Sequence, residues 1–251
     1  MNETEPKIRL HVDAPLHAGA EIALDRGQSN YLVTVMRLAA GAGVAVFNGR
    51  DGEWRADLTD AHRKAATLTA REMMRPQTPL PDLHLVFAPI RKARTDFIVE
   101  KACETGCARV RPVITRYTQS ERLNLDRLRA HMLEAAEQCG GVSIPDLDPP
   151  QPLTTLLAEW PADRKLIFCD EARTAPPMLT ALAGIPRGTP AALLIGPEGG
   201  FSPEEAARLH AHPATLPVSL GPRILRADTA AVAALALAQV ALGDWCEDRG
   251  A

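Results

Sequence analysis

Short apolar segments separated by turn residues make up the first part of the chain. They cover residues 8–12, 21–24, 44–47, 53–58 and 66–72. Their length and the frequent turns, such as Asn48 to Gly52, predict strands, and a further apolar stretch predicts one helix over residues 28–38. We therefore expect a small β-barrel here. Three prolines in the six residues 76–81 then oppose both helix and sheet and predict a linker.

Beyond the linker, apolar strands alternate with amphipathic helices. The predicted strands are residues 83–90, 110–117, 165–170, 191–195 and 216–220. Helices are predicted at 95–103, starting from a Thr or Asp cap, and at 125–139, where apolar residues recur every three or four positions before Gly140. Strands alternating with helices predict an α/β fold with a parallel sheet and helices on both faces.

The composition is that of an ordinary soluble globular protein, with 251 residues, 46% hydrophobic and 24% charged. Its first ten residues lack the apolar run of a signal peptide. The most apolar predicted helix, residues 229–242, is shorter than the roughly 20 residues that a membrane span needs. We expect a cytoplasmic protein without a membrane partner.

Metal binding is not expected. The five cysteines form no Cys-x-x-Cys pair, which is typical of reduced, mostly buried thiols in a cytosolic chain. Cys103 and Cys107 lie one helical turn apart, and His210 and His212 have no cysteine or carboxylate cluster beside them. We read the histidines as surface residues.

Positive charge is concentrated in one stretch, although the net charge of the whole chain is −3. Residues 91–129 contain ten Lys or Arg and five acidic residues, a local net charge of +5. This stretch is either an electrostatic footprint for nucleic acid or simply a solvated charged face.

Two glycine-containing turns near the C-terminal end carry the most chemistry. The first, LLIGPEGGFSPEE (193–205), leads from a strand into a helix start, where Ser202, Pro203 and Glu205 fit the N-cap, first helical position and capping-box partner. The second, SLGPRILRADTAA (219–231), leads from a strand into an alanine-rich helix expected from about Asp228. Glycine turns expose backbone N–H and C=O groups, and ligands of α/β sheets bind beyond the carboxyl ends of strands. We expect both loops to wall one pocket.

This pair of loops resembles the SPOUT class of S-adenosylmethionine-dependent RNA methyltransferases, and within it the ribosomal RNA small subunit methyltransferase E family. RKARTDFIVEKACETG (91–106), EAAEQCG (134–140) and YLVTVMRLAAGAGVAVFNGRDGEW (31–54) also resemble that family. The resemblance implies a PUA-like RNA-binding barrel over residues 1–75 and a SPOUT domain with a trefoil knot over residues 82–251. It also implies methylation of uracil N3 in 16S rRNA or the small ribosomal subunit, and a homodimer.

The resemblance also assigns site residues. Those expected to bind S-adenosylmethionine are Ile195, Gly196, Pro197, Gly199, Gly200, Leu220, Gly221, Ile224 and Leu225. Those expected to bind RNA are Arg91, Lys92, Lys101 and Arg116. Asp170 and Glu171 either form a third cofactor loop or cap a helix.

Arg226 is the candidate cation for stabilising a deprotonated uracil, with phosphate binding as the alternative. Glu198 is the candidate base, because it lies within the cofactor turn; Asp228 is a second carboxylate that either accepts a proton or caps a helix.

Some positions depart from the family pattern. Arg226-Ala227-Asp228-Thr229 stands where the family usually reads Arg-Thr-Glu-Thr, and Gly141 replaces a common arginine. A non-catalytic RNA-binding or ribosome-assembly protein is therefore the alternative function. A nucleotide-phosphate enzyme is a weaker alternative, because the first loop lacks the Gly-Lys-Ser/Thr ending of a P-loop and contains the acidic Glu198.

Overall fold

The computed structural model describes residues 6–119, 122–172 and 174–246. The chain packs as two compact units. Unit 1 comprises Met1–Pro79 with Ala136–Ile144, and unit 2 comprises Leu80–Ala135 with Pro145–Ala251. The sequence-based domain boundaries, 1–75 and 82–251, stay a prediction. Residues 1–5, used in the signal-peptide prediction, and Glu121, counted in the basic stretch, lie outside the described residues.

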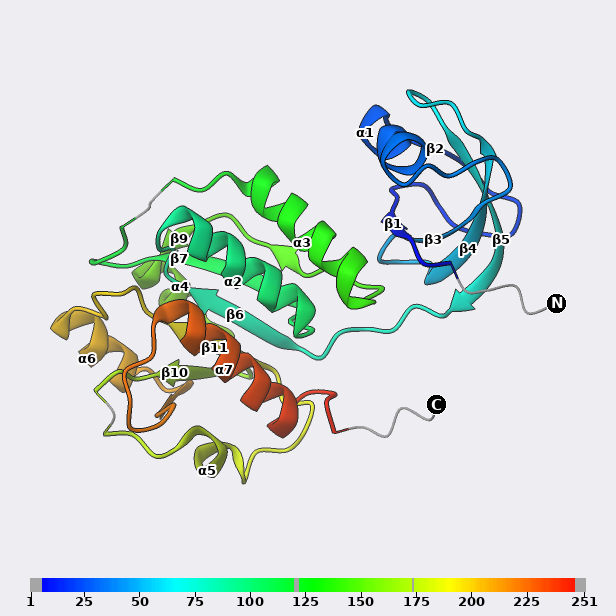
Figure 1. Cartoon of the computed structure of the whole chain (residues 1–251). Coiled ribbons are helices and arrows are strands. Elements are labelled where there is room, and N and C mark those ends of the chain that lie inside the picture. The colour runs from blue at the N-terminus through cyan, green and yellow to red at the C-terminus, as the bar shows by residue number, and fades with distance from the viewer. Residues whose placement is uncertain (1–5, 120–121, 173, 247–251) are drawn as a thin grey trace. The chain divides into compact units, whose positions relative to one another are not determined.

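A curved β-sheet forms unit 1 (Figure 1), with the strand order β1-β3-β4-β5-β2. Its strands are β1 (Arg9–His11), β2 (Glu21–Ala23), β3 (Gly43–Phe47), β4 (Glu53–Asp60) and β5 (Thr67–Arg75). All pairings are antiparallel except β1 with β3. Alternate residues, among them Val44, Val46 and Leu58, are fully buried in one core, as expected for strands with one face inward. Each predicted strand of this region is present.

The predicted helix over residues 28–38 is divided in the structure. It consists of α1 (Arg26–Asn30), which Asp25 and Gln28 start with a capping box, and a π-helical turn η1 (Tyr31–Val35). The chain leaves η1 through Arg37, whose φ of 56° is left-handed. A backbone hydrogen bond of 3.0 Å from Leu38 to Leu32 closes this end, as in other helix termini with a left-handed residue.

Arg9 holds the segment 136–144 within unit 1. Its guanidinium donates to the carbonyl oxygens of Ala136 (2.6 Å), Glu137 (3.0 Å) and Gly141 (2.7 Å), and it also pairs with Glu53 at 2.6 Å. Gly141, where the family commonly has arginine, thus contributes its backbone to the packing of unit 1.

Unit 2 is built on a parallel sheet with the strand order β12-β10-β11-β6-β7-β8, and β9 also pairs with β7. Its strands are β6 (Leu83–Phe87), β7 (Arg109–Ile114), β8 (Asp146–Leu147), β9 (Gln151–Pro152), β10 (Lys165–Cys169), β11 (Ala191–Ile195) and β12 (Thr215–Val218). Its helices are α2 (Lys92–Glu104), α3 (Leu125–Cys139), α4 (Leu153–Ala158), α5 (Met178–Leu182), α6 (Pro203–Ala211) and α7 (Ala227–Ala241). All five predicted strands are present, and the short elements β8, β9, α4 and α5 were not predicted.

Helices cover both faces of this sheet. On one face, Leu156 of α4 and Leu209 of α6 join a buried cluster with Val86, Phe168 and Leu194 of the central strands. On the other face, α2 and α7 lie side by side, and α7 packs on β6 and β11 (Figure 1). The predicted α/β architecture is confirmed, and the central strands are apolar on both faces, as in other covered parallel sheets.

Two predicted N-cap residues are wrong, although α7 begins within one residue of the expected Asp228. The N-cap of α2 is Arg91, because Thr95 is fully buried and its hydroxyl bonds to the backbone N–H and C=O of Ile90. The N-cap of α7 is Arg226 and not Asp228, which lies in the first turn.

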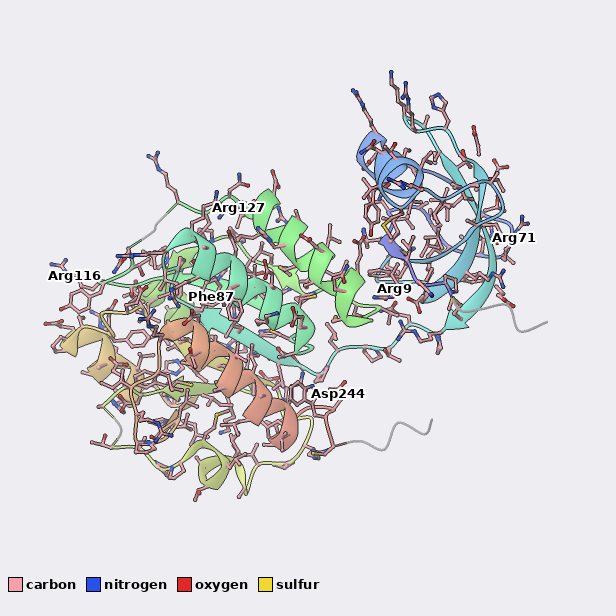
Figure 2. The ribbon with its side chains drawn as sticks, in the orientation of Figure 1. Arg9, Arg71, Phe87, Arg116, Arg127 and Asp244 are labelled. Atoms are coloured by element: carbon pink, nitrogen blue, oxygen red, sulfur yellow. The ribbon has the colours of Figure 1, made fainter. Side chains whose placement is uncertain are left out.

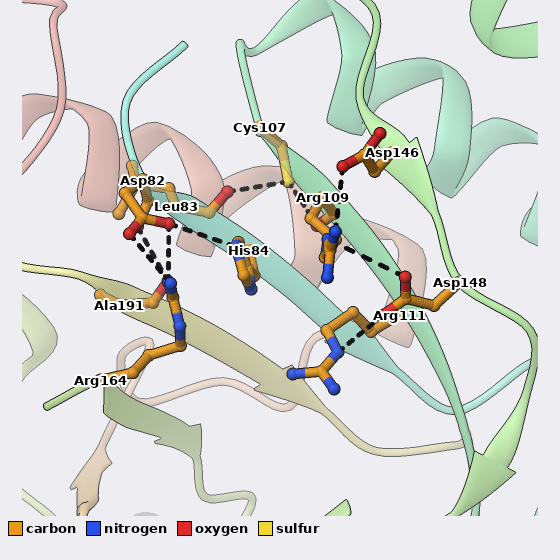
Figure 3. Close-up of polar contacts among 10 residues, drawn as sticks. All are labelled: Asp82, Leu83, His84, Cys107, Arg109, Arg111, Asp146, Asp148, Arg164 and Ala191. Atoms are coloured by element: carbon orange, nitrogen blue, oxygen red, sulfur yellow. Dashed lines mark hydrogen bonds and ion pairs between the residues drawn. The ribbon is translucent and has the colours of Figure 1, made fainter. Parts of the chain in front are cut away.

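Polar side chains form ion pairs across the amino ends of the strands of unit 2 (Figure 3). Arg109 and Arg111 of β7 each pair at 3.0 Å with an aspartate of the neighbouring β8 segment, Asp146 and Asp148 respectively. At the β6 side, Asp82 accepts from Arg164 at 2.9 Å and lies 3.2 Å from His84 Nε2. The cofactor loops lie at the opposite, carboxyl edge of the sheet.

Candidate cofactor and RNA site

The turns after β11 and β12 wall one pocket of about 390 Å³. It is lined by all nine residues expected to bind the cofactor, from Ile195 to Gly200 and from Leu220 to Leu225, and by Glu198 and Arg226. The structure therefore brings the two sequence motifs together, because β10 lies between β11 and β12 and all three strands end at the same edge. The role of each residue toward a ligand stays a prediction.

Glycine is required in the first turn for reasons of packing. A Cβ on Gly196 would lie 2.7 Å from the ring of Phe201, which is buried and stacks edge-on against Phe168 with centroids 5.3 Å apart. Gly200 has a φ of 69°, and a Cβ there would meet the carboxylate of Glu171. The turn closes through a 2.9 Å bond from the Gly200 amide to the Pro197 carbonyl.

The helix start after this turn is as predicted. Ser202 is the N-cap of α6, its hydroxyl accepts from the Glu205 amide at 3.2 Å, and Glu205 accepts from the Ser202 amide at 2.9 Å. This capping box is confirmed, with Pro203 in the first helical position. It fixes the direction in which the chain leaves the pocket.

The second loop leaves backbone groups available to a ligand. Within the described residues, the backbone N–H and C=O groups of Leu220, Ile224 and Leu225 make no hydrogen bond with the protein. Since unmet backbone groups are favourable partners for a polar ligand edge, these three positions can recognise a ligand without a charged side chain.

Asp170 and Glu171 form a third wall of the pocket. Glu171 Oε1 accepts from the Phe201 amide at 3.1 Å, and Asp170 Oδ1 accepts from the Ala172 amide at 2.9 Å. The next helix, α5, is capped at Pro177, so the alternative reading of Asp170 and Glu171 as a helix cap is wrong. Glu171 instead ties this wall to the first cofactor turn.

Arg226 and Glu198 both lie on the pocket wall. Within the described residues, the exposed side chains of Arg226 and Glu198 make no hydrogen bond or ion pair. Asp228, by contrast, is engaged: Oδ2 pairs with Arg94 of α2, and Oδ1 accepts from the Thr229 amide at 2.9 Å. Its reading as a helix N-cap is wrong, because the N-cap of α7 is Arg226. Its reading as a proton acceptor stays a prediction. Arg94 carries no sequence pattern that identifies this partner.

The predicted RNA-binding residues divide into two groups. Arg91 and Lys92 are exposed at the start of α2, just beyond the carboxyl end of β6, and Arg116 is exposed beyond the end of β7 (Figure 2). These three therefore lie on the edge of the sheet that holds the pocket. Lys101 does not, because it follows Lys92 by about 14 Å along the helix and pairs with Glu104 at 2.5 Å.

No group of three or more potential metal ligands occurs among the described residues. Burial raises the pKa of Cys107 and of Cys169 to about 12, which keeps both thiols protonated. Cys139 and Cys246 are exposed, contrary to the expectation of mostly buried thiols. In the part of the chain that the structure covers, none of the helices has the length and apolarity needed to span a membrane.

Most of the chain is similar to known RNA methyltransferases. Residues 76–239 match the model of the RNA methyltransferase domain, and residues 24–70 match that of the RNA methyltransferase PUA domain. The ribosomal RNA small subunit methyltransferase E of Synechocystis sp. is 32% identical over 221 residues, covering 86% of this chain and 72% of the relative. That of Rickettsia conorii is 27% identical over 241 residues, covering 96% and 98%.

Solved structures agree. A methyltransferase from Legionella pneumophila in complex with S-adenosylmethionine is 28% identical, with a TM-score of 0.84 over 96% of this chain and 100% of the other. The ribosomal RNA small subunit methyltransferase E of Neisseria gonorrhoeae, 24% identical, has the same fold, with a TM-score of 0.84 over 95% and 99%. The predicted fold class is confirmed: a SPOUT-type parallel sheet with helices, preceded by a PUA-like β domain. From its matched domains and from these relatives, the chain belongs to the ribosomal RNA small subunit methyltransferase E family of RNA methyltransferases.

Proposed function

We propose that this enzyme uses S-adenosylmethionine to methylate N3 of a uridine in 16S ribosomal RNA. The observation that carries the proposal is the pocket between the two glycine turns. Within the described residues, one wall has backbone groups without hydrogen bonds, and Arg226 and Glu198 beside them make no ion pair. Family membership and the bound cofactor of the Legionella relative support the choice of ligand.

The pocket fits this cofactor in size and chemistry. Its volume of about 390 Å³ lies in the range of small-molecule sites. The backbone groups of Leu220, Ile224 and Leu225 suit the donors and acceptors of an adenine edge, and the bare turn from Gly196 to Gly200 lets a ligand approach closely. When bound, S-adenosylmethionine supplies an electrophilic methyl group.

Arg226 and Glu198 carry the chemistry of the proposed reaction. Uracil N3 must lose its proton to become a nucleophile, and Glu198, an exposed carboxylate on the pocket wall, is the proposed acceptor. The resulting negative charge spreads onto the two carbonyl oxygens of the ring. The exposed guanidinium of Arg226 stabilises that charge. Asp228, by contrast, is paired with Arg94.

RNA binding is assigned to Arg91, Lys92 and Arg116 at the pocket edge, with Lys101 further along α2. Their charges attract phosphates and hold the RNA while the target base enters the pocket. The proposed partners are 16S rRNA or the small ribosomal subunit, and a second copy of the chain in a homodimer, all in the cytoplasm. Residues 1–75 are the proposed RNA-binding domain, and residues 82–251 the proposed transfer domain.

Transfer of a labelled methyl group tests the proposal. The purified protein is mixed with labelled S-adenosylmethionine and small subunits from a strain lacking the gene, and the rRNA is digested to nucleosides. N3-methyluridine is the expected product. Label at another nucleoside would refute the position, and RNA binding without any transfer would favour the non-catalytic alternative.

Arg226→Ala tests the chemistry. The single-turnover rate should fall by roughly 10²–10³, the scale of losing one preorganised donor, while affinities for RNA and cofactor change little. Raising the pH should restore part of the rate, because N3 then ionises without help. Arg187→Ala is the matched control, since Arg187 bonds to the Val240 carbonyl (2.7 Å) and does not line the pocket. A loss of RNA affinity equal to the loss of rate would make Arg226 a phosphate ligand instead.

A further inference from the structure

An exposed aromatic ring lies against the first cofactor turn. Tyr117, in the loop after β7, is 45% exposed. A Cβ built on Gly199 would lie 3.2 Å from Tyr117 Cβ and 3.7 Å from Cδ2 of its ring. The tyrosine therefore flanks the residue that forms the rim of the pocket.

The loop that carries Tyr117 is held in place by several hydrogen bonds. The Thr118 hydroxyl bonds to the Thr115 amide (2.8 Å) and hydroxyl (2.9 Å), and the Thr118 amide donates to the Thr115 carbonyl at 3.2 Å. The amide of Arg116 donates to Glu205 Oε1 at 2.8 Å, and Glu205 also forms the capping box of α6. The ring is thus presented from a fixed turn, anchored to the helix that leaves the cofactor loop.

Among the described residues, the Tyr117 ring lies outside the buried apolar clusters. Tyr117 is part of neither the apolar core of unit 1, which contains Val44, nor the buried cluster of unit 2 that contains Phe168. Within the described residues its hydroxyl makes no hydrogen bond. An exposed aromatic side chain on a rigid turn at the edge of a ligand pocket is typical of a surface that stacks on a planar group.

Neighbouring side chains specify what stacks there. Arg116 precedes Tyr117 and is exposed, so it can bind a phosphate next to a base on the ring. Ile224, on the second cofactor loop, lines the pocket and is 76% exposed, which gives the pocket another apolar surface. A ring with a cation beside it suits an unpaired nucleotide, since every base has a π-face.

We propose that Tyr117 is the stacking platform for the unpaired target base, which it holds at the mouth of the cofactor pocket. This inference rests on the proposed function, because it takes the RNA to that pocket. Stacking on the ring offsets part of the free energy needed to unstack the base from its neighbours in the RNA. A fixed ring also orients the base toward the cofactor turn, and bases that are not held in this orientation react slowly.

Binding of a fluorescently labelled single-stranded oligouridine of ten nucleotides to the cofactor-loaded protein tests the inference. Tyr117→Leu should weaken binding by about 5- to 150-fold, the scale of removing one base–aromatic stack, whereas Tyr117→Phe should bind within about twofold of the wild type. The salt dependence should be unchanged in Tyr117→Leu, because a stack releases no counterions, and should decrease in Arg116→Ala. Trp245→Leu, which removes a ring 50% exposed elsewhere in unit 2, is the control and should bind normally.

Three outcomes distinguish the stacking role of Tyr117 from the proposed methyltransferase function. If the wild type methylates rRNA but Tyr117→Leu binds and reacts as the wild type does, stacking is wrong and the proposed function stands. If the wild type transfers no methyl group but only Tyr117→Leu loses oligouridine binding, the platform stands and the proposed function fails. If Tyr117→Leu loses affinity for S-adenosylmethionine in calorimetry to the same degree, the ring merely supports Gly199, and the inference is overturned.

Discussion

His84 should make unit 2 sensitive to mild acid. Its side chain is only 12% exposed, and Nε2 lies 3.2 Å from Asp82 (Figure 3). Burial, reinforced by Arg164, lowers the pKa of His84 from 6.5 to about 4, although Asp82 opposes the shift. The folded protein therefore keeps this imidazole neutral at pH values where the unfolded chain protonates it.

The sign and size of the effect follow from proton linkage. Between pH 6.5 and about 4 the unfolded state binds more protons at this residue, so the free energy of unfolding falls as the pH falls. At 1.36 kcal/mol per pH unit the full contribution is about 3 kcal/mol. Between pH 7.5 and 5.0 about 2 kcal/mol of it should be lost. Above about pH 8 the residue should have almost no effect on the pH dependence of stability.

His84→Gln replaces the titrating imidazole by a neutral side chain whose amide can still donate a hydrogen bond to Asp82. Urea unfolding at pH 7.5 and 5.0, followed by hydrogen exchange of peptides from β6 and β7, reports on unit 2 alone. Between pH 7.5 and 5.0, the free energy of unfolding should fall by about 2 kcal/mol less in the variant than in the wild type. His17→Gln, at an exposed histidine of unit 1, is the control and should match the wild type. Parallel losses in His84→Gln and wild type would refute the reasoning.

Three further outcomes are expected. Gly196→Ala should destabilise unit 2 by about 1–3 kcal/mol in urea unfolding, because the Phe201 ring must move to make room for the methyl group. The variant should also bind the cofactor more weakly in calorimetry. Wild-type stability and affinity would contradict the packing argument. Replacing Arg91 and Lys92 by Ala should make the plot of log K for RNA binding against log salt concentration less steep, by roughly 0.7–0.9 per lost phosphate contact, with cofactor affinity unchanged. An unaltered slope would mean that the two residues are only a solvated charged face. Arg94→Ala should cost about 1–3 kcal/mol of unfolding free energy, since it leaves a largely buried carboxylate without its partner, and an unchanged stability would show that the pair is unimportant.

Local sequence determined the elements and their ends wherever the necessary partners lie within a few residues. The capping box of Ser202 and Glu205 is one example, and α3 begins and ends where its apolar spacing and Gly140 predict. Strand positions followed from apolar periodicity, because burial on a sheet selects every second residue or a continuous apolar run. The two glycine loops were recognisable as ligand turns for the same reason, since helix caps and bare backbone are local features.

Tertiary structure decided what those local features do. Thr95 resembles a helix cap in sequence, yet it is buried against Ile90 and α2 starts earlier. Asp228 is a free carboxylate in sequence, and only the packing of α7 beside α2 supplies Arg94 as its partner.

The same applies to the pocket and its rim. Gly196 is a flexible turn residue in sequence, but the Phe201 ring is what excludes a side chain there. Tyr117 meets Gly199 although 82 positions separate them in the chain, as their numbers show. Contacts of this kind depend on strand order and helix packing, which bring together residues that no short-range pattern connects, so the sequence determined the parts of the site and the fold determined their partners.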